Sequence, residues 1–174
     1  MPPPDSGAPP APWQRGYLHV GGVCGVAFSA DGRWLLVISH NGTGLFDCES
    51  LERVSRDYSD YGAYDRQTGT VDGIGALEGM RVPIHGMRGA IETSAQLPTR
   101  TADGWELQWK EEPEYLGRPD TPVYLRAPHQ VAGPGYLLGE FEPIYAIGFS
   151  PTGRTLVIAE SYTITVFSRP QAGT

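Results

Sequence analysis

One segment of the chain occurs twice, and this repeat limits the possible folds more than any other feature. Residues 23–47, VCGVAFSADGRWLLVISHNGTGLFD, align without a gap with residues 144–168, IYAIGFSPTGRTLVIAESYTITVFS. The identical pairs include Phe28 with Phe149, Ser29 with Ser150, Gly32 with Gly153, Arg33 with Arg154, Leu35 with Leu156 and Phe46 with Phe167. Such a repeat predicts the architecture, because similar sequences form similar units, but it leaves the activity open.

Each copy is typical of three antiparallel strands joined by short turns. In the first copy Asp31-Gly32 predicts one tight turn, and Asn41-Gly42 predicts a hairpin because both residues tolerate the positive φ that such turns need. In the second copy Pro151 occupies the first turn, where its fixed φ suits the backbone. A meander with apolar residues on both faces of its middle strand needs neighbouring sheets to cover it.

The two copies resemble a blade of the WD-repeat β-propeller family, whose pattern begins V-x-F-S-P-D-G-x-x-L. The first copy carries this pattern at residues 26–35, VAFSADGRWL, and has Phe46 where the family has Trp. The second copy keeps residues 149–153, FSPTG, and has Phe167 at the Trp position; neither copy has the WD dipeptide. The resemblance implies an all-β fold, a small WD-repeat or β-propeller-like domain of antiparallel three- to four-stranded sheets.

The length of the chain restricts what these units can build. A blade takes about 40–45 residues and closed propellers usually have about four to eight blades. A chain of 174 residues with two recognisable units therefore excludes a regular ring of about seven blades. A very small ring with irregular blades, two sheets packed as a sandwich, or units shared between two chains remain open. We expect one compact domain, an incomplete or degenerate propeller or sandwich, with the terminal units side by side.

The predicted organisation is a tail followed by one domain. Residues 1–12, MPPPDSGAPPAP, predict a disordered Pro/Ala-rich tail without the apolar core of a secretory signal. Residues 13–170 predict a single β domain, with blade-like units at 17–54 and 136–168 and an irregular middle at 55–135. Residues 13–20 predict the outer strand of the first sheet, and residues 80–84 predict a short strand in the middle.

The middle of the chain contains one further strong strand signal. In residues 101–112, TADGWELQWKEE, the side chains of Trp105, Leu107 and Trp109 share one face by alternation. Residues 121–128 predict its hairpin partner. The pair can form a third, degenerate blade, because the Trp/Leu/Trp face needs a covering sheet.

Charge and hydropathy narrow the function classes. The formal net charge of −7 disfavours binding to a nucleic-acid backbone, which depends on basic patches, and suits either a basic protein partner or simple solubility. No run approaches the roughly 18 apolar residues of a membrane span, so we expect a soluble, cytoplasmic protein without a membrane partner. The two cysteines, Cys24 and Cys48, predict reduced, buried thiols, and no metal or cofactor motif is present.

The most distinctive candidate surface is residues 57–65, DYSDYGAYD, which combine flat amphipathic rings with negative charge. This composition suits a grip on an Arg/Lys-rich protein surface, and an acidic stretch at residues 111–114 suits the same partner. The alternative is a solvated loop whose tyrosines fold back onto the sheets. The candidate partner-binding residues are Asp57, Tyr58, Asp60, Tyr61, Tyr64, Asp65, Glu111, Glu112 and Glu114.

No motif in the sequence predicts catalysis. The four histidines lie in separate segments and without the spacing of a metal site or a nucleophile elbow. We therefore predict a non-catalytic protein-binding module, monomeric or homodimeric. A narrower hypothesis is a small acidic immunity or antitoxin protein that neutralises a basic toxin or enzyme. The alternatives are a small hydrolase with a carboxylate or histidine site assembled by the fold, and a structural assembly subunit.

Overall fold

The computed structural model describes residues 7–58, 64–65, 67–88, 91–92, 96–110 and 120–170. Apart from one 3-10 turn, η1 (Gly75–Leu77), the regular elements in these ranges are strands, so the all-β prediction is confirmed. The strands are β1 (Gln14–His19), β2 (Val23–Phe28), β3 (Trp34–Ser39), β4 (Gly42–Asp47), β5 (Arg53–Asp57), β6 (Thr70–Asp72), β7 (Arg81–Pro83), β8 (Met87–Arg88), β9 (Ile91–Glu92), β10 (Glu106–Trp109), β11 (Thr121–Arg126), β12 (Tyr136–Phe141), β13 (Ala146–Phe149), β14 (Thr155–Ala159) and β15 (Thr163–Ser168).

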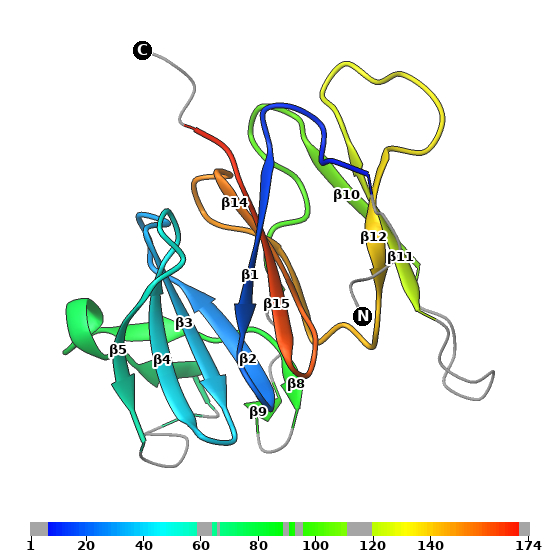
Figure 1. The fold of residues 1–174 in the computed structure, drawn as a ribbon. Helices are drawn as coiled ribbons and strands as arrows, with labels where there is room; N and C mark the ends of the chain where they lie inside the picture. The colour runs from blue at the N-terminus through cyan, green and yellow to red at the C-terminus, as the bar shows by residue number, and fades with distance from the viewer. Residues whose placement is uncertain are drawn as a thin grey trace.

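The strands form three larger sheets and two small hairpins, all antiparallel. The first-repeat sheet has the order β2-β3-β4-β5, the second-repeat sheet β1-β15-β14-β13 and the middle sheet β10-β11-β12. The hairpins are β6-β7 and β8-β9. Figure 1 shows the three larger sheets next to one another, with the second-repeat sheet between the other two. None of the chain's described helical residues forms a segment long and apolar enough to cross a membrane.

The sequence repeat is also a structural repeat. The first copy forms β2, β3 and β4, and the second copy forms β13, β14 and β15. Phe28 lies opposite Leu35, which lies opposite Phe46. Phe149, Leu156 and Phe167 form the same cross-strand row in the second copy. The conserved spacing therefore produces the same register in both meanders.

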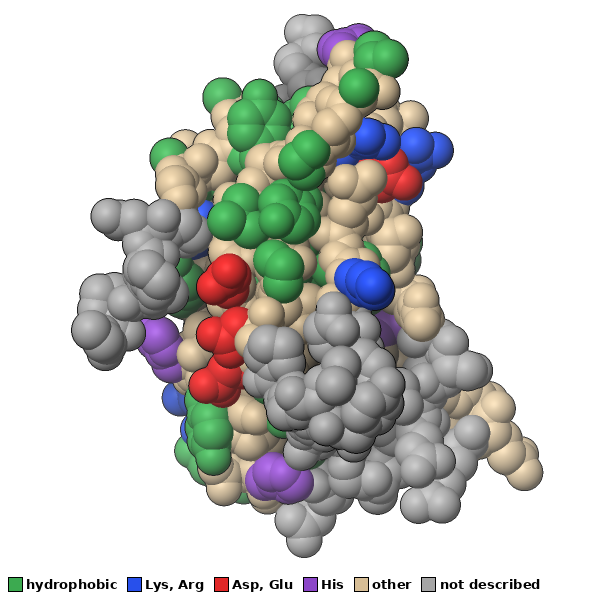
Figure 2. Space-filling view, turned by 90° about the vertical axis from the view of Figure 1, so that its right-hand side faces the viewer, with side chains coloured by type: hydrophobic (Ala, Val, Ile, Leu, Met, Phe, Trp, Pro, Cys, Tyr) green, Lys and Arg blue, Asp and Glu red, His purple; other side chains and the backbone are tan. Residues whose placement is uncertain are grey.

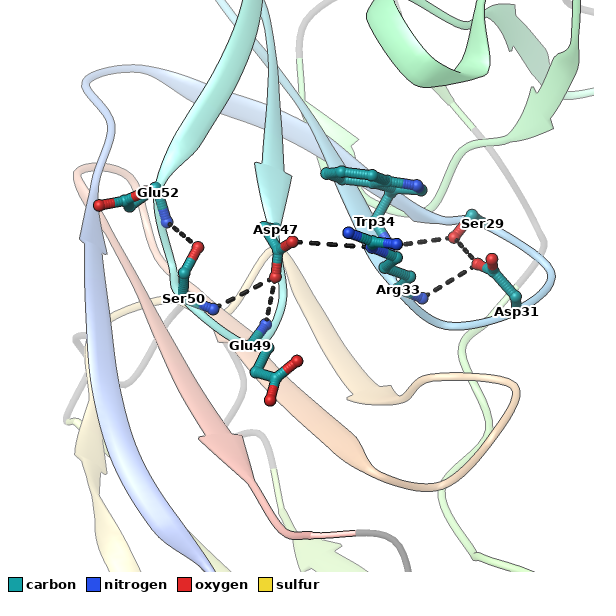
Figure 3. Close-up of polar contacts among 8 residues, drawn as sticks. All are labelled: Ser29, Asp31, Arg33, Trp34, Asp47, Glu49, Ser50 and Glu52. Carbon is teal, nitrogen blue, oxygen red and sulfur yellow. Dashed lines mark hydrogen bonds and ion pairs between the residues drawn. The ribbon is translucent and has the colours of Figure 1, made fainter.

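The first turn of each copy is held by a serine hydroxyl. Ser29 Oγ donates to the Asp31 carboxylate at 2.6 Å and accepts the Trp34 backbone N–H at 3.0 Å, while Gly32 has φ 70° (Figure 3). In the second copy Ser150 Oγ lies 3.1 Å from the Thr152 hydroxyl and accepts the backbone N–H of residue 155 at 3.2 Å. The hydroxyl thus replaces a missing backbone partner in both turns.

A third turn of this kind precedes β10. Thr101 Oγ1 donates to Asp103 at 2.7 Å and accepts the Trp105 backbone N–H at 2.9 Å, and Gly104 has φ 99°. The turn from Thr101 to Trp105 is one residue shorter than that from Ser29 to Trp34, so a gapless comparison does not detect it. The β10–β11 hairpin confirms the predicted pairing of the two middle segments.

Two predicted unit boundaries are wrong. Residues 13–20 were expected in the first sheet, but β1 pairs with β15, from Gln14 opposite Ser168 to His19 opposite Thr163. The outer position of the first-repeat sheet is already taken by β5, which follows β4 through a short turn. The predicted unit at residues 136–168 is divided, because β12 forms a hairpin with β11 and not with β13.

The two repeats pack against each other through unlike faces. Phe28 and Leu35 of the first-repeat sheet share one buried cluster with Val157 and Val166 of the second-repeat sheet. In the first repeat the residues equivalent to Val157 and Val166 are Leu36 and Leu45, which belong to a different cluster. The Phe28 face of the first repeat therefore packs against the non-equivalent face of the second repeat. The two sheets are stacked in the same sense and do not form a two-fold symmetric sandwich, in which equivalent faces would meet.

The stacking of one face against the non-equivalent face of the next sheet continues on both sides of this pair of repeats. Phe149 and Leu156, the equivalents of Phe28 and Leu35, pack with Trp105 and Leu107 of the middle sheet. The Leu36 face of the first-repeat sheet is covered by β6, β7 and η1 through residues Val71, Leu77, Val82 and Ile84. The predicted strand at residues 80–84 is therefore confirmed as β7, and it closes one side of the stack.

The middle sheet stands at the other end of the stack. Alignment of its turn with the first repeat places Glu106 and Gln108 where the first repeat has Leu35 and Val37. Figure 2 looks onto this side of the molecule and shows hydrophobic side chains gathered above a group of acidic ones. The polar substitutions on β10 suit an end sheet whose outer face meets solvent.

Candidate functional site

A pocket of about 200 Å³ opens between the first-repeat sheet and the end of β1. Its lining residues come from the β1–β2 connection and from the β3–β4 hairpin, so its walls are built by separate segments of the chain. The lining residues are His19, Val20, Gly21, Ser39, Asn41, Gly42, Thr43, Gly44, Phe46, Arg53 and Arg56. We call this the rim pocket.

Two glycines on β4 leave the space for the rim pocket. Gly42 and Gly44 alternate along the strand with Phe46, so all three face the second-repeat sheet. A Cβ at Gly44 would meet the Phe46 ring at 3.1 Å and the Arg53 Cδ at 3.5 Å. The second copy has threonine at both equivalent positions, so the hollow belongs to the first copy alone.

Two arginines of β5 face the same hollow. In a regular strand, residues three apart point to opposite faces. An irregularity in the β4–β5 register instead places Arg53 opposite Phe46 and Arg56 opposite Gly44, so both arginines lie on the pocket face. Asp57 pairs with Thr43 and therefore lies on the other face. The Arg53 guanidinium forms no hydrogen bond or ion pair with another described residue.

Two exposed tyrosines flank the rim pocket. The Tyr58 side chain is 74% exposed, and the Arg56 guanidinium carbon lies 4.4 Å from its ring centroid. Arg56 also donates to the Asn41 carbonyl at 3.4 Å. Tyr162, 70% exposed, lies against Gly21 and holds the position in the second repeat that Asn41 holds in the first. The pocket thus lies between the equivalent hairpin tips of neighbouring repeats.

The predicted tyrosine and aspartate surface is divided by the structure. Tyr58 is exposed beside the rim pocket, whereas Tyr64 is half-buried against the core between β3, β4 and β6. Asp65 accepts backbone N–H bonds from residues 67 and 68, at 2.8 and 3.4 Å, which lower the pKa of its carboxyl group and tie it into a turn. The candidates Asp60, Tyr61, Glu111, Glu112 and Glu114 lie outside the described residues.

Other carboxylates are also engaged in turns. Asp47 accepts the backbone N–H groups of Glu49 and Ser50, and its second oxygen lies 3.7 Å from Arg33 Nε (Figure 3). The Arg169 guanidinium donates hydrogen bonds to both carboxylate oxygens of Asp103, at 2.6 and 2.8 Å. These bonds lower the pKa of the Asp103 carboxyl group far below its usual range. Several carboxylates are therefore already engaged within turns, while the described lining of the rim pocket carries cations and no carboxylate.

The ionisable side chains in the described lining of the rim pocket are one histidine and two arginines. His19 is the single histidine among the described lining residues, and no carboxylate or cysteine stands beside it there. Across the described ranges, no group of three or more His, Cys, Asp or Glu side chains could hold a metal ion. Cys24 and Cys48 are buried, as predicted, and neither forms a disulfide with a described residue; burial raises the pKa of the Cys48 thiol to about 12.

A second exposed region lies on the middle sheet. The β11–β12 hairpin exposes the large apolar side chains of Val131, Tyr136 and Leu137. This hairpin belongs to the middle sheet, whereas the rim pocket is lined by residues of β1, the β1–β2 connection, β3, β4 and β5. Tyr136, which is 53% exposed, serves as a reference position on this region.

The sequence reasoning missed the arginines and the glycines of the rim pocket. A visible signal was the replacement of two threonines of the second copy by Gly42 and Gly44 in the first. Neither a protein-family model nor a curated protein sequence matches the chain.

Proposed function

We propose that the protein is a non-catalytic protein-binding module that engages its partner through Arg53, Arg56, Tyr58 and Tyr162, which we call the rim patch. The observation that carries the proposal is that two exposed tyrosines lie next to lining residues of a pocket with two arginines on its wall, Tyr58 next to Arg56 and Tyr162 next to Gly21. Tyrosine and arginine are the residues most enriched, with tryptophan, among interface positions that dominate binding energy.

The rim patch is partly ordered before binding. Arg56 is held by the Tyr58 ring and by the Asn41 carbonyl, so less side-chain freedom is lost when a partner arrives. Tyr58 and Tyr162 each have few rotatable bonds and present a flat apolar ring with a polar tip. These properties favour a protein surface as the ligand.

The charge of the rim patch favours an acidic group on the partner. Both arginines lie on the pocket face, and Asp57 lies on the opposite face of β5. The basic partner predicted from the sequence depends on Asp57 together with acidic residues outside the described ranges, and it stays a prediction. The toxin-neutralising hypothesis stays a prediction as well.

We also propose that the repeated sheets are related to the blades of WD-repeat proteins. This proposal is supported by the stacking of the repeated sheets in the same sense and by the three equivalent turns before β3, β10 and β14. Blade-like sheets commonly present hairpin tips to partners, and the rim patch lies at two such tips.

Photo-crosslinking tests the proposal. The crosslinking amino acid p-benzoylphenylalanine is placed at Tyr58, at Tyr162 or, as the control, at the exposed Tyr136 of the middle sheet, and the host cells are irradiated. We expect one discrete crosslinked protein, the same for positions 58 and 162 and absent for position 136. A product common to all three positions, or none at 58 and 162, would contradict the proposal.

A variant then tests the energetics with the purified crosslinked partner. Arg56→Ala removes both the pocket cation and the stacking support of Tyr58, and we expect about tenfold weaker binding by isothermal titration calorimetry. Arg154→Ala, at an exposed turn of the second repeat, removes the same charge elsewhere and should leave the affinity within about twofold. Equal losses in the two variants would indicate a nonspecific charge effect.

A further inference from the structure

We infer that the rim pocket binds a single oxyanion group, either a carboxylate or a phosphate. The ligand inserts this group between the β3–β4 hairpin and the β1–β2 connection. This inference rests on the proposed function in one respect only: the partner protein is taken to be the source of the anion. The site itself is argued from the pocket and tested on the protein alone.

The size of the pocket fits one functional group. About 200 Å³ equals the volume of roughly six or seven water molecules, at about 30 Å³ each. Sites for drug-sized ligands span about 300–1,000 Å³. A carboxylate or phosphate group with its attached carbon or bridging atoms fits this space, whereas a whole nucleotide does not.

The lining chemistry selects an anion. Arg53 and Arg56 stand on one wall, and the side chains of His19 and Asn41 on the other walls can donate hydrogen bonds. No carboxylate is present among the described lining residues to neutralise the arginines. The planar guanidinium matches the geometry of carboxylate and phosphate oxygens and can donate two parallel hydrogen bonds.

Arg53 is an exposed cation on the pocket wall that is available to bind such a ligand. Its guanidinium has no hydrogen-bond or ion-pair partner among the described residues, although Asp72, Asp103 and Glu106 each pair with an arginine elsewhere. The register irregularity that turns Arg53 toward the pocket brings two like charges to one face. An oxyanion between them relieves this repulsion, because each guanidinium then gains a charge-assisted hydrogen bond.

The second repeat provides an internal comparison. The positions equivalent to Gly42 and Gly44 carry Thr163 and Thr165, so the equivalent face has no hollow of this origin. Gly44→Thr therefore installs a residue that the same structural position accepts in the other repeat. Gly44 lies in a strand without positive φ, so the substitution fills the pocket without backbone strain, and the Phe46 ring, 3.1 Å from the new Cβ, has to shift by a few tenths of an ångström.

The experiment is a titration of the ¹⁵N-labelled full chain with sodium phosphate and, separately, with sodium acetate, at constant ionic strength maintained with sodium chloride. The readout is the chemical shift of the backbone amides of Gly21, Asn41 and Gly44 and of the Arg53 and Arg56 Nε–H groups. We expect saturable shifts confined to these signals. Tighter binding of phosphate identifies a phosphorylated group as the source, and tighter binding of acetate identifies a carboxylate.

Three variants and one control make the assignment specific. Arg53→Gln and Arg56→Gln should each weaken oxyanion binding about tenfold, because one charge-assisted bond is lost. Gly44→Thr should abolish the shifts while the rest of the spectrum keeps the native dispersion. Arg154→Gln removes one charge from a distant exposed turn and should leave the dissociation constant within about twofold.

The inference is overturned if neither salt produces saturable shifts at the pocket signals. It is also overturned if Arg154→Gln weakens binding as much as Arg53→Gln. The proposed binding function fails separately, because its test is the crosslink at Tyr58 and Tyr162. A crosslinked partner without oxyanion binding leaves the module proposal standing and removes the pocket assignment.

Discussion

At the scale of single residues, short polar side chains hold the turns that position the sheets. Ser29, Thr101 and Ser150 each accept the backbone N–H that opens the following strand. Asp31 and Asp103 accept the hydroxyl proton in two of these turns. Because a buried N–H without an acceptor costs about 1–3 kcal/mol, these side chains contribute to stability and are not merely solvated.

The contact between Asp103 and Arg169 gives the first prediction. Arg169 also lies over the Trp13 ring, at 4.9 Å, and donates to the Gly153 carbonyl at 3.0 Å, so it joins three parts of the fold. Asp103→Asn should lower the free energy of unfolding by about 1 kcal/mol, a value kept small because the carboxylate is 55% exposed and screened by solvent. Urea denaturation measures the change.

Asp72→Asn is the matched control for this prediction. Asp72 pairs with Arg81 at 2.6 Å, but both side chains are exposed and the pair lies at the end of the short β6–β7 hairpin. We expect a change below about 0.5 kcal/mol, as for other surface pairs. A loss for Asp72→Asn as large as that for Asp103→Asn would contradict the special role given to Arg169.

At the scale of elements, the repeated turn gives the second prediction. Ser29→Ala and Ser150→Ala each remove the acceptor for a strand-opening N–H, and each should cost about 1–2 kcal/mol. Ser29→Thr should keep most of the stability, because Thr101 performs the same role before β10. Thermal and urea denaturation of the purified variants provide the measurement.

Ser50→Ala provides the reference for the turn variants. Its hydroxyl accepts the Glu52 N–H at 3.2 Å in an exposed turn, where water can replace it. The expected change is within about 0.5 kcal/mol. If Ser29→Ala and Ser150→Ala cost no more than Ser50→Ala, the three turns are not the structural unit that we describe.

The elements that could be predicted from the sequence are those whose signals are local. The repeated meanders, the Asp31-Gly32 turn, β7 and the β10–β11 hairpin are confirmed, because alternation and turn residues specify them within a few positions. The predicted hairpin between β3 and β4 also forms, but its turn lies one residue earlier than predicted: Ser39 pairs with Gly42, and only Gly42 of the expected Asn41-Gly42 pair has a positive φ. The pairing of β1 with β15 was not predictable in this way, since the sequence of an outer strand does not state which sheet edge it joins.

The rim pocket could not be predicted from local sequence signals either. Arg53 and Arg56 are three residues apart and would point to opposite faces of a regular strand. The register irregularity between Leu45 and Phe46 brings them to one face, and no local sequence signal specifies it. The remaining wall of the rim pocket comes from residues 19–21, which depend on where β1 pairs.

At the scale of the whole molecule, the titrating groups predict how stability changes with pH. The pKa values of Asp31, Asp65 and Asp103 are lowered from 3.8 in the folded protein, mainly by hydrogen bonds to Ser29, Gln67 and Arg169 respectively. These groups therefore contribute stability that is present above about pH 4 and is lost as the pH falls through their folded values. Urea midpoints should fall steeply below about pH 4, and less steeply in Asp103→Asn.

Glu160 acts in the opposite direction. Burial raises its pKa above 4.5, so its ionised form is disfavoured in the folded state, and protonation relieves this cost as the pH falls from neutral. Glu160→Gln keeps an acceptor for the Glu142 N–H and should raise the urea midpoint at about pH 7. No increase at about pH 7, or an equal increase at about pH 4, would contradict this assignment.

The arrangement of the whole molecule depends on one long-range pairing. β1 completes the second-repeat sheet, and its end brings residues 19–21 against the glycine-lined face of β4. The stack then continues in one direction, from the middle sheet through both repeats to β6 and β7. The rim pocket depends on the pairing of β1 with β15, because this pairing places residues 19–21 beside β4.

A nuclear Overhauser experiment on the labelled protein tests this pairing most directly. We predict Hα–Hα contacts at alternate registered pairs between Gln14–His19 and Thr163–Ser168, as antiparallel strands require. Contacts between residues 14–19 and an edge strand of the first-repeat sheet, as the predicted place of residues 13–20 in the first sheet implies, would contradict the fold and the pocket together.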